Sequence, residues 1–486
     1  MLSLTDRLTV PQVFFNEFHV GGADETMKFL HAWDRDKTGR TAKQIYDREI
    51  GSRADPSDPR LAVPTDPPVE EAAAPPRPNK KTEVKLPVKD ASSVSHLIER
   101  TDSVLNVTRE LMVVLPANIM PYMITTYKDC FRGSEGISAI KNHFGFQSRL
   151  AALEFARYLQ NEHKILHHVC NEHEIADTFH LYFRLQVYHT PDVLNSFRIW
   201  TERVDVANPL GVVKRCRKLM NQLEAHHTFT DGTMDYVSAK SDARFLEFDE
   251  AVCELQGLDL SVMDEKTKLA FCINVYNLMI KHAFIKIGVP SSNLTRSAFF
   301  NGVKYNLGGQ LFSFSELENG ILRSNSKAPY SLSKPFGRSD PRIKLICEKL
   351  DPRIHFALNC GANSCPPVKN FTAESIEEEL RVVAQAFCEQ DTSVAVDEDL
   401  NELHLCMIFS WYRSDFAESA SSLPTRIISY LRGSKRLALA RMLLSNKTIT
   451  LRWMSYDWNT NASRKIDFDP STLNPNEKLM SCWSKQ

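Results

Sequence analysis

A proline-rich segment divides this chain of 486 residues into a short N-terminal piece and a long C-terminal part. Nine of the chain's 24 prolines lie between residues 51 and 94, where few large apolar side chains occur. Proline lacks a backbone donor, and so little apolar surface cannot offset the entropy lost on ordering. We therefore expect residues 51–94 to form an extended, disordered linker. The total length predicts about three domains.

The charges are nearly balanced, with 59 basic and 60 acidic side chains, which argues against nucleic acid as a partner of the whole chain. The 11 cysteines, from Cys130 to Cys482, are an odd number and predict reduced thiols rather than a disulfide framework. The N-terminus lacks the pattern of a secretory signal. The most apolar stretch, Leu269 to Val289, is interrupted by polar residues such as Lys281. These observations predict a cytoplasmic protein.

The N-terminal piece, residues 1–50, is expected to form two strands and a helix. Thr9 to Phe15 is rich in β-forming residues, Phe18 to Val20 is a second short strand, and Asp24 can cap a helix. Two strands and a helix bury too little apolar surface to be stable alone.

The runs Thr9-Val10-Pro11 and Phe18-His19-Val20-Gly21-Gly22-Ala23-Asp24 resemble the C-terminal half of a glutaredoxin. This resemblance implies a partial thioredoxin-like β-β-α fragment, in which Val10, Pro11, Gly22, Ala23 and Asp24 would contact glutathione. The reactive Cys-x-x-Cys of that family lies upstream, whereas no cysteine precedes Cys130 here. Disulfide exchange needs a thiolate, so we expect weak or no glutathione binding and no cofactor.

The second segment, residues 95–187, is predicted to contain two helices followed by a β-hairpin. Ser134 can cap the first helix and Gly145 can end it, while Ser148 can cap the second. Two strands follow, at residues 165–170 and 179–186, the latter with alternating apolar side chains. This order of elements is typical of a winged helix.

The run Thr126 to Glu135 and the later Phe179 to Arg184 resemble the signature of the DEP family. The resemblance implies a DEP winged-helix domain that places signalling proteins at membranes or on receptor tails. Candidate contacts with phospholipid are the basic residues Lys128, Arg132, Lys141 and Arg149, each of which has an ordinary solvated side chain as its alternative. Glu154 and Glu162 in the second helix argue against DNA binding.

The third segment, residues 190–486, is predicted to be a mixed α+β domain with a helical lead-in. Helical periodicity covers residues 194–225, 239–258 and 265–286, and Val303 to Leu307 is a strand ending at Gly308-Gly309. Ser315 and Glu318 have the spacing of a capping box. Residues 353–359 alternate as a strand. The whole chain is therefore expected to be a multidomain α+β protein.

Two cysteines and a histidine in this segment have the pattern of a reactive site. In the expected strand, His355 and Asn359 share one face, and Cys365 follows shortly before an expected helix at residues 372–383. A helix N-terminus can stabilise a thiolate, and a histidine can act as its base. Asn274 or Asn359 could orient the imidazole. Two alternatives stay open: structural thiols beside a buried histidine, and a zinc site made by His355, Cys360 and Cys365.

The third segment also resembles the family described as domain of unknown function 547. The matching runs include residues 270–277, 318–323, 355–366, 409–416 and 456–458, so the resemblance covers about residues 245–458. It implies a fold without naming a reaction.

The leading functional hypothesis is an intracellular signalling adaptor, placed by its DEP domain at a membrane phospholipid or receptor tail and binding other signalling proteins. It would be cytoplasmic and peripheral at the membrane. The alternative is a thiol hydrolase or acyltransferase with the catalytic residues Cys365, His355, Asn274 and Asn359. A weaker alternative is a glutathione-linked redox protein. The first two differ in whether Cys365 and His355 converge in an open pocket.

Overall fold

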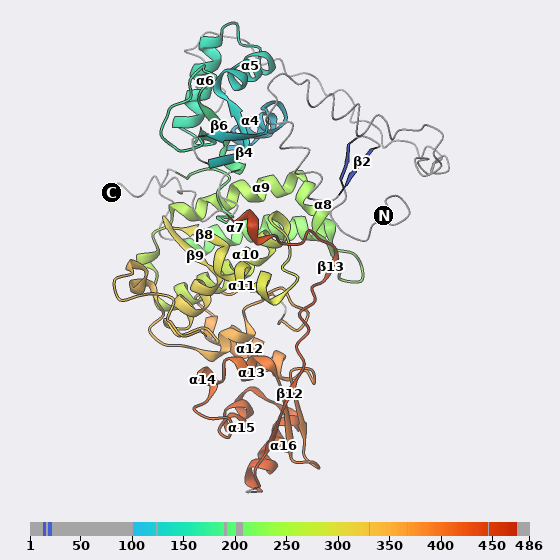
Figure 1. Cartoon of the computed structure of the whole chain (residues 1–486). Coiled ribbons are helices and arrows are strands. Elements are labelled where there is room, and N and C mark those ends of the chain that lie inside the picture. Colours follow the sequence, from blue (N-terminus) through green and yellow to red (C-terminus); the bar gives the residue numbers. More distant parts are fainter. Residues whose placement is uncertain are drawn as a thin grey trace, which may run out of the picture. The chain divides into compact units, whose positions relative to one another are not determined.

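The computed structural model describes residues 13–15, 18–21, 101–122, 125–188, 192–200, 208–329, 331–366, 368–445 and 447–473 (Figure 1). The chain divides into two compact units, Met1–Lys85 and Leu86–Gln486. In the first unit, β1 (Val13–Phe15) and β2 (Phe18–Gly21) form the antiparallel hairpin expected from the sequence, with Phe15 opposite Phe18. The expected helix after Asp24, the linker at 51–94 and all five glutathione candidates lie outside the described residues.

The second unit begins with a module of helices and a four-stranded sheet, residues 101–188. Its elements are α4 (Thr101–Val114), β3 (Asn118–Tyr122), β4 (Thr125–Arg132), α5 (Gly133–Phe144), α6 (Arg149–Asn161), β5 (Leu166–His168), β6 (Tyr182–Leu185) and η6 (Gln186–Tyr188), with the sheet order β3-β4-β6-β5. Gly145 ends α5 with a φ of 72°, and the Ser148 hydroxyl accepts a bond from the Ala151 amide at the start of α6. The predicted order of two helices and a hairpin is confirmed.

The remainder of the unit is mixed α+β, as predicted. Its first half contains α7 (Pro209–His227), β7 (Met234–Asp235), α8 (Tyr236–Ser241), α9 (Ala243–Ala251), η7 (Val252–Gly257), η8 (Leu260–Val262), α10 (Glu265–Lys286), α11 (Asn293–Gly302), β8 (Lys304–Leu307), β9 (Gln310–Ser313) and the π-helical turn η9 (Glu316–Leu322). Its second half contains η10 (Pro341–Leu345), η11 (Pro352–Phe356), α12 (Ile376–Cys388), β10 (Val394–Asp397), β11 (Glu402–Cys406), α13 (Met407–Trp411), α14 (Arg413–Phe416), α15 (Leu423–Ile427), η12 (Ile428–Tyr430), α16 (Gly433–Leu444), β12 (Thr450–Met454), β13 (Ala462–Arg464) and η13 (Pro470–Thr472).

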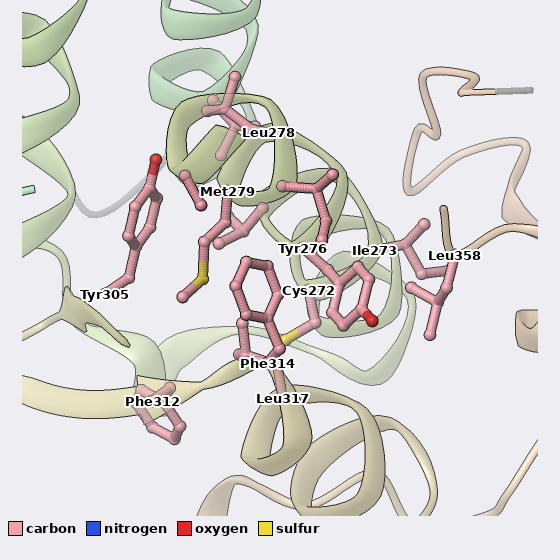
Figure 2. Packing of buried hydrophobic residues seen from close by; sticks show 14 of the residues in the cluster. Cys272, Ile273, Tyr276, Leu278, Met279, Tyr305, Phe312, Phe314, Leu317 and Leu358 are labelled. Carbon is pink, nitrogen blue, oxygen red and sulfur yellow. The ribbon is translucent and has the colours of Figure 1, made fainter. Parts of the chain in front are cut away.

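Helix α10 is the centre of the larger hydrophobic core, and its bounds are those predicted. It begins after Asp264, whose carboxylate accepts a bond from the Thr267 amide. Figure 2 shows its side chains packed against the hairpin β8–β9 and against η9. The hairpin turns at Gly308 and Gly309, where both φ angles are positive, which glycine adopts without strain. The strand and turn predicted there are confirmed.

Several predictions about this part were wrong. Residues 353–359 are not a strand, because Pro352 opens the 3₁₀ helix η11 and the Asp351 carboxylate accepts a bond from the Arg353 amide. The helix expected from residue 372 begins only at Ile376. The periodic stretch 239–258 is also divided, by Asp242, into α8 and α9.

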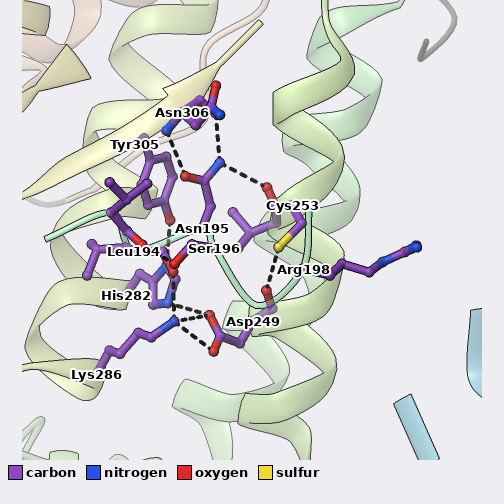
Figure 3. A network of polar contacts seen from close by, with 12 residues as sticks. Leu194, Asn195, Ser196, Arg198, Asp249, Cys253, His282, Lys286, Tyr305 and Asn306 are labelled. Carbon is purple, nitrogen blue, oxygen red and sulfur yellow. Dashed lines mark hydrogen bonds and ion pairs between the residues drawn. The ribbon is translucent and has the colours of Figure 1, made fainter. Parts of the chain in front are cut away.

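A buried polar network connects α9, α10 and the segment before α7 (Figure 3). The Asp249 carboxylate lies 2.7 Å from Nζ of Lys286 and 3.0 Å from Nε2 of His282. Nδ1 of His282 lies 2.8 Å from the Tyr305 hydroxyl. Because each charged group has a partner, the network can be buried in the core.

Candidate active site

A cavity of about 450 Å³ lies where the two hydrophobic cores of the C-terminal part meet. Ile354 belongs to the core around α10 and Phe356 to the core around α12 and β10–β12, so the intervening His355 is fixed between them. The cavity is lined by Tyr276, Asn293, Arg296, Phe300, Asn301, Ser315, Glu318, Asn319, Ala328, Pro329, His355, Leu358, Cys360, Cys365, Ile408, Trp411, Tyr412, Tyr456 and Trp458. Both Cys365 and His355 therefore face one pocket.

Cys360 and Cys365 form a close pair of free thiols in the cavity wall, with their sulfurs 2.9 Å apart. The Cys365 sulfur also accepts a hydrogen bond from the backbone amide of Cys360 and lies 3.2 Å from the Tyr456 hydroxyl. Burial alone would raise the pKa of Cys365, but the hydrogen bonds from Cys360 and Tyr456 outweigh it and lower this pKa below the usual range. The pKa of Cys360 is raised well above its usual value by the same contact, so Cys360 keeps its proton and donates.

The loop between the two cysteines has a fixed shape. The Asn359 side chain donates to the Pro366 carbonyl and accepts from the Gly361 amide. Asn277 clamps the start of the loop by bonding the Ala357 carbonyl and the Asn359 amide. Asn274 bonds both backbone groups of Phe371. Asn277 and Asn359 thus hold the cysteine loop, Asn274 holds the chain at Phe371, and the buried Asn277 has the polar partners that its burial requires.

The residue that orients His355 is Asp415, in α14, and not Asn274 or Asn359. Nε2 of His355 lies 2.8 Å from Oδ2 of Asp415, and the guanidinium of Arg323 bonds both carboxylate oxygens. Burial would raise the pKa of Asp415, but the bonds from His355 and Arg323 outweigh it and lower this pKa to about 2. The ring of His355 stacks on Tyr412 with centroids 3.9 Å apart. Among the described residues nothing bonds to Nδ1, which is left for a ligand.

Glu318 is part of the cavity and does not complete a capping box. Its carboxylate accepts bonds from the hydroxyls of Tyr412, at 2.5 Å, and Tyr276, at 3.4 Å. The helical turn is instead closed by Ser313 and Glu316, which bond each other's backbone amides. The prediction of a capping box formed by Ser315 and Glu318 was therefore wrong.

The zinc alternative finds no support in the described part of the chain, where no group of three or more His, Cys, Asp or Glu side chains could hold a metal ion. In particular, Nε2 of His355 is bonded to Asp415 rather than directed at Cys360 and Cys365. The helix dipole expected to activate Cys365 is also absent from the site, because α12 begins at Ile376. Hydrogen bonds from Cys360 and Tyr456 lower the pKa of Cys365 instead.

The four basic candidates for a membrane contact differ in their surroundings. Lys128, on β4, is exposed, and Lys141 is half-buried. Arg132 lies near Glu135, and Arg149 forms a bidentate ion pair with Asp177 at 2.5 and 2.6 Å. No described helix is long and apolar enough to cross a bilayer.

Residues 260–388 match the family model described as a protein of unknown function, DUF547. The match contains α10, α11, the cysteine loop and His355, and ends within the C-terminal turn of α12. It does not extend to the segments that resemble a DEP domain or a glutaredoxin, so both resemblances stay predictions. No curated protein and no solved structure matches the chain.

Several residues of the site, in the cavity wall or in contact with His355, were not singled out for chemistry in the sequence. Asp415, Tyr412 and Tyr456 lie within runs that resemble the family, which was the available signal, but their contacts with His355 and Cys365 cross long stretches of chain. Arg296 had no sequence signal at all. It lies on the cavity face of α11.

Proposed function

We propose that the C-terminal part is a cysteine-dependent acyl hydrolase or acyltransferase, with Cys365 as nucleophile. The observation that carries the proposal is the convergence of Cys365, with its lowered pKa, and of His355, held by an ionised Asp415, on one cavity. A thiolate with a nearby acid–base group is the usual arrangement for covalent acyl transfer.

The role of His355 differs from that of the histidine in a direct Cys–His pair, because the Cys365 thiolate is stabilised by Tyr456 and Cys360. The thiolate attacks the acyl carbon, a C–S bond forms, and the carbonyl electron pair moves to oxygen. The pKa of Tyr456 is raised by burial, so its hydroxyl stays protonated and can donate to this oxyanion. When the Cys365 thiol ionises, His355 takes up its proton. As the tetrahedral intermediate collapses, the carbonyl re-forms, the bond to the leaving group breaks, and His355 gives this proton to that group.

The resulting thioester is resolved by water or by an acceptor amine or alcohol. His355, now neutral, takes the proton of this second nucleophile while the C–S bond breaks and the Cys365 thiolate leaves. Asp415 stabilises the imidazolium in both half-reactions and holds the ring through Nε2, which leaves Nδ1 for the proton transfer.

An activated ester, p-nitrophenyl acetate, tests this proposal with the full-length protein. We expect an initial burst of p-nitrophenol, an acetyl group on the peptide containing Cys365, and loss of both in Cys365→Ala. In His355→Ala the acetyl group should accumulate, because the second step lacks its base. A protein that is acetylated equally in wild type and Cys365→Ala would contradict the proposal.

We also propose that the module at residues 101–188 places this enzyme at an anionic membrane as a signalling DEP domain would. The observation in favour is that Ile119, 67% exposed, lies on β3 beside β4, which carries the exposed Lys128. An apolar residue next to a cation fits a lipid headgroup region. Sedimentation with phosphatidylserine vesicles should be reduced in Lys128→Glu and unchanged in Lys447→Glu, and equal sedimentation of both would refute it.

A further inference from the structure

Arg296 is a cation of the cavity without an acidic partner. No carboxylate of the described residues lies within ion-pair distance of its guanidinium, whose polar contact is the Asn293 side chain at 2.9 Å. The other charged groups near the cavity are engaged: Arg323 bonds Asp415, and Glu318 accepts from two tyrosines. Arg296 is thus the permanent positive charge of the described lining that stays available to a ligand.

The position of Arg296 is fixed by the fold. Asn293, Arg296 and Phe300 are spaced three and four residues apart on α11, so they share one helix face, and all three line the cavity. The guanidinium stacks on the ring of Trp458 at 4.2 Å, which restricts its rotamers. Cys360, Cys365 and Tyr456 line the same cavity as Arg296. The cation is therefore held in the wall of the cavity that contains the proposed nucleophile.

A half-buried guanidinium that is held in place and unpaired is suited to a carboxylate, which it can bind with two parallel hydrogen bonds. The neighbouring wall is aromatic, since Trp411 and Trp458 pack with ring centroids 5.4 Å apart. A substrate with a carboxylate and an apolar body would contact both. We propose that Arg296 forms a carboxylate subsite, so that the substrates of this cavity are acyl compounds bearing a free carboxylate.

The carboxylate subsite rests on the proposed function only in that its ligands are taken to be acyl compounds. Two experiments on the full-length protein test the subsite and the proposed function separately. The first compares alkylation of Cys365 by iodoacetate, which carries a carboxylate, and by neutral iodoacetamide; in both, the thiolate displaces iodide. We expect the ratio of the iodoacetate rate to the iodoacetamide rate to be about tenfold higher for Cys365 than for free cysteine. Arg296→Gln should remove this preference, Arg296→Lys should keep part of it, and Arg381→Gln, at an exposed site on α12, should change nothing.

The second experiment does not need a reactive thiol. In Cys365→Ala, phenylacetate should bind at least about fivefold more tightly than phenylacetamide by calorimetry, and Arg296→Gln should close that gap. Thermal unfolding of each variant checks that it is folded. Equal affinity for the two probes, or binding of neither at millimolar concentration, would overturn the carboxylate subsite even if Cys365 proves reactive. An inert Cys365 in a cavity that prefers phenylacetate would instead overturn the enzyme proposal and leave the subsite standing.

Discussion

Oδ2 of Asp415 lies 2.8 Å from Nε2 of His355, although 60 positions separate the two residues along the chain. The same oxygen lies 2.6 Å from Nε of Arg323, and the side chains of Asp415 and Arg323 are 4% and 3% exposed. A carboxylate so buried is tolerated because both neighbours donate to it. The contact connects α14, outside the matched family segment, to η11 within it.

We expect Asp415→Asn to lower the free energy of unfolding by about 3–5 kcal/mol, because Arg323 would remain buried without its counter-charge. Urea unfolding of the full-length protein measures this. The matched control is Asp391→Asn, whose side chain is 86% exposed beside Lys435 and should cost less than about 1 kcal/mol. Similar losses in the two variants would show that the contacts of Asp415 with Arg323 and His355 stabilise the fold no more than an exposed ion pair does.

Gly361, between the two cysteines, is expected not to tolerate a side chain. Its φ is +86°, and an added Cβ would lie 2.3 Å from the ring of Phe284. We expect Gly361→Ala to lower stability by about 2–4 kcal/mol and to slow labelling of Cys365, because the loop must shift. Gly232→Ala is the control: its φ is +83°, but nothing lies within 4 Å, so only the cost of the backbone conformation, about 1–2 kcal/mol, should appear. Equal losses at both glycines would contradict this packing.

The buried network around His282 predicts a pH dependence of stability. Burial lowers the pKa of His282 from 6.5 to about 4, against the opposing effect of Asp249. The unfolded chain therefore binds a proton between pH 6.5 and 4 that the folded chain does not. The contribution of this group to stability is complete above pH 6.5 and is lost as the pH falls towards 4.

We expect the difference in unfolding free energy between wild type and His282→Gln to shrink by roughly 2–3 kcal/mol from pH 7 to pH 4.5. Denaturant titrations at several pH values measure it. A difference that stays constant over that range would mean that burial does not lower the pKa of His282 in the folded protein.

How far the sequence could predict this site depended on how local each feature is. The bounds of α10 and the turn at Gly308 follow from neighbouring residues, and both were predicted. The alternation of apolar and polar residues at 353–359 is that of a strand. The residues that start a 3₁₀ helix there, Asp351 as its cap and Pro352 as its first residue, come before the alternating stretch.

The pairing of His355 with Asp415, and of Cys365 with Tyr456, could not be predicted in this way. Both depend on segments that come together only in the folded chain, over separations of 60 and 91 residues. The sequence therefore identified the cysteine and the histidine, and assigned their supporting groups to nearby asparagines and a helix end. Asn359 shapes the cysteine loop instead, and Asn274 holds the chain at Phe371.

The central claim is that the fold makes Cys365 a nucleophile, and the pH dependence of its alkylation by iodoacetamide tests this most directly. Peptide mapping of the folded, full-length protein should give a rate profile with its midpoint below the value of about 8.5 for an ordinary thiol. Tyr456→Phe, which removes a hydroxyl 3.2 Å from the sulfur, should move that midpoint upward and slow labelling at pH 7 several-fold. Labelling that appears only after denaturant is added, in wild type and Tyr456→Phe alike, would contradict the account and identify Cys365 as a structural thiol.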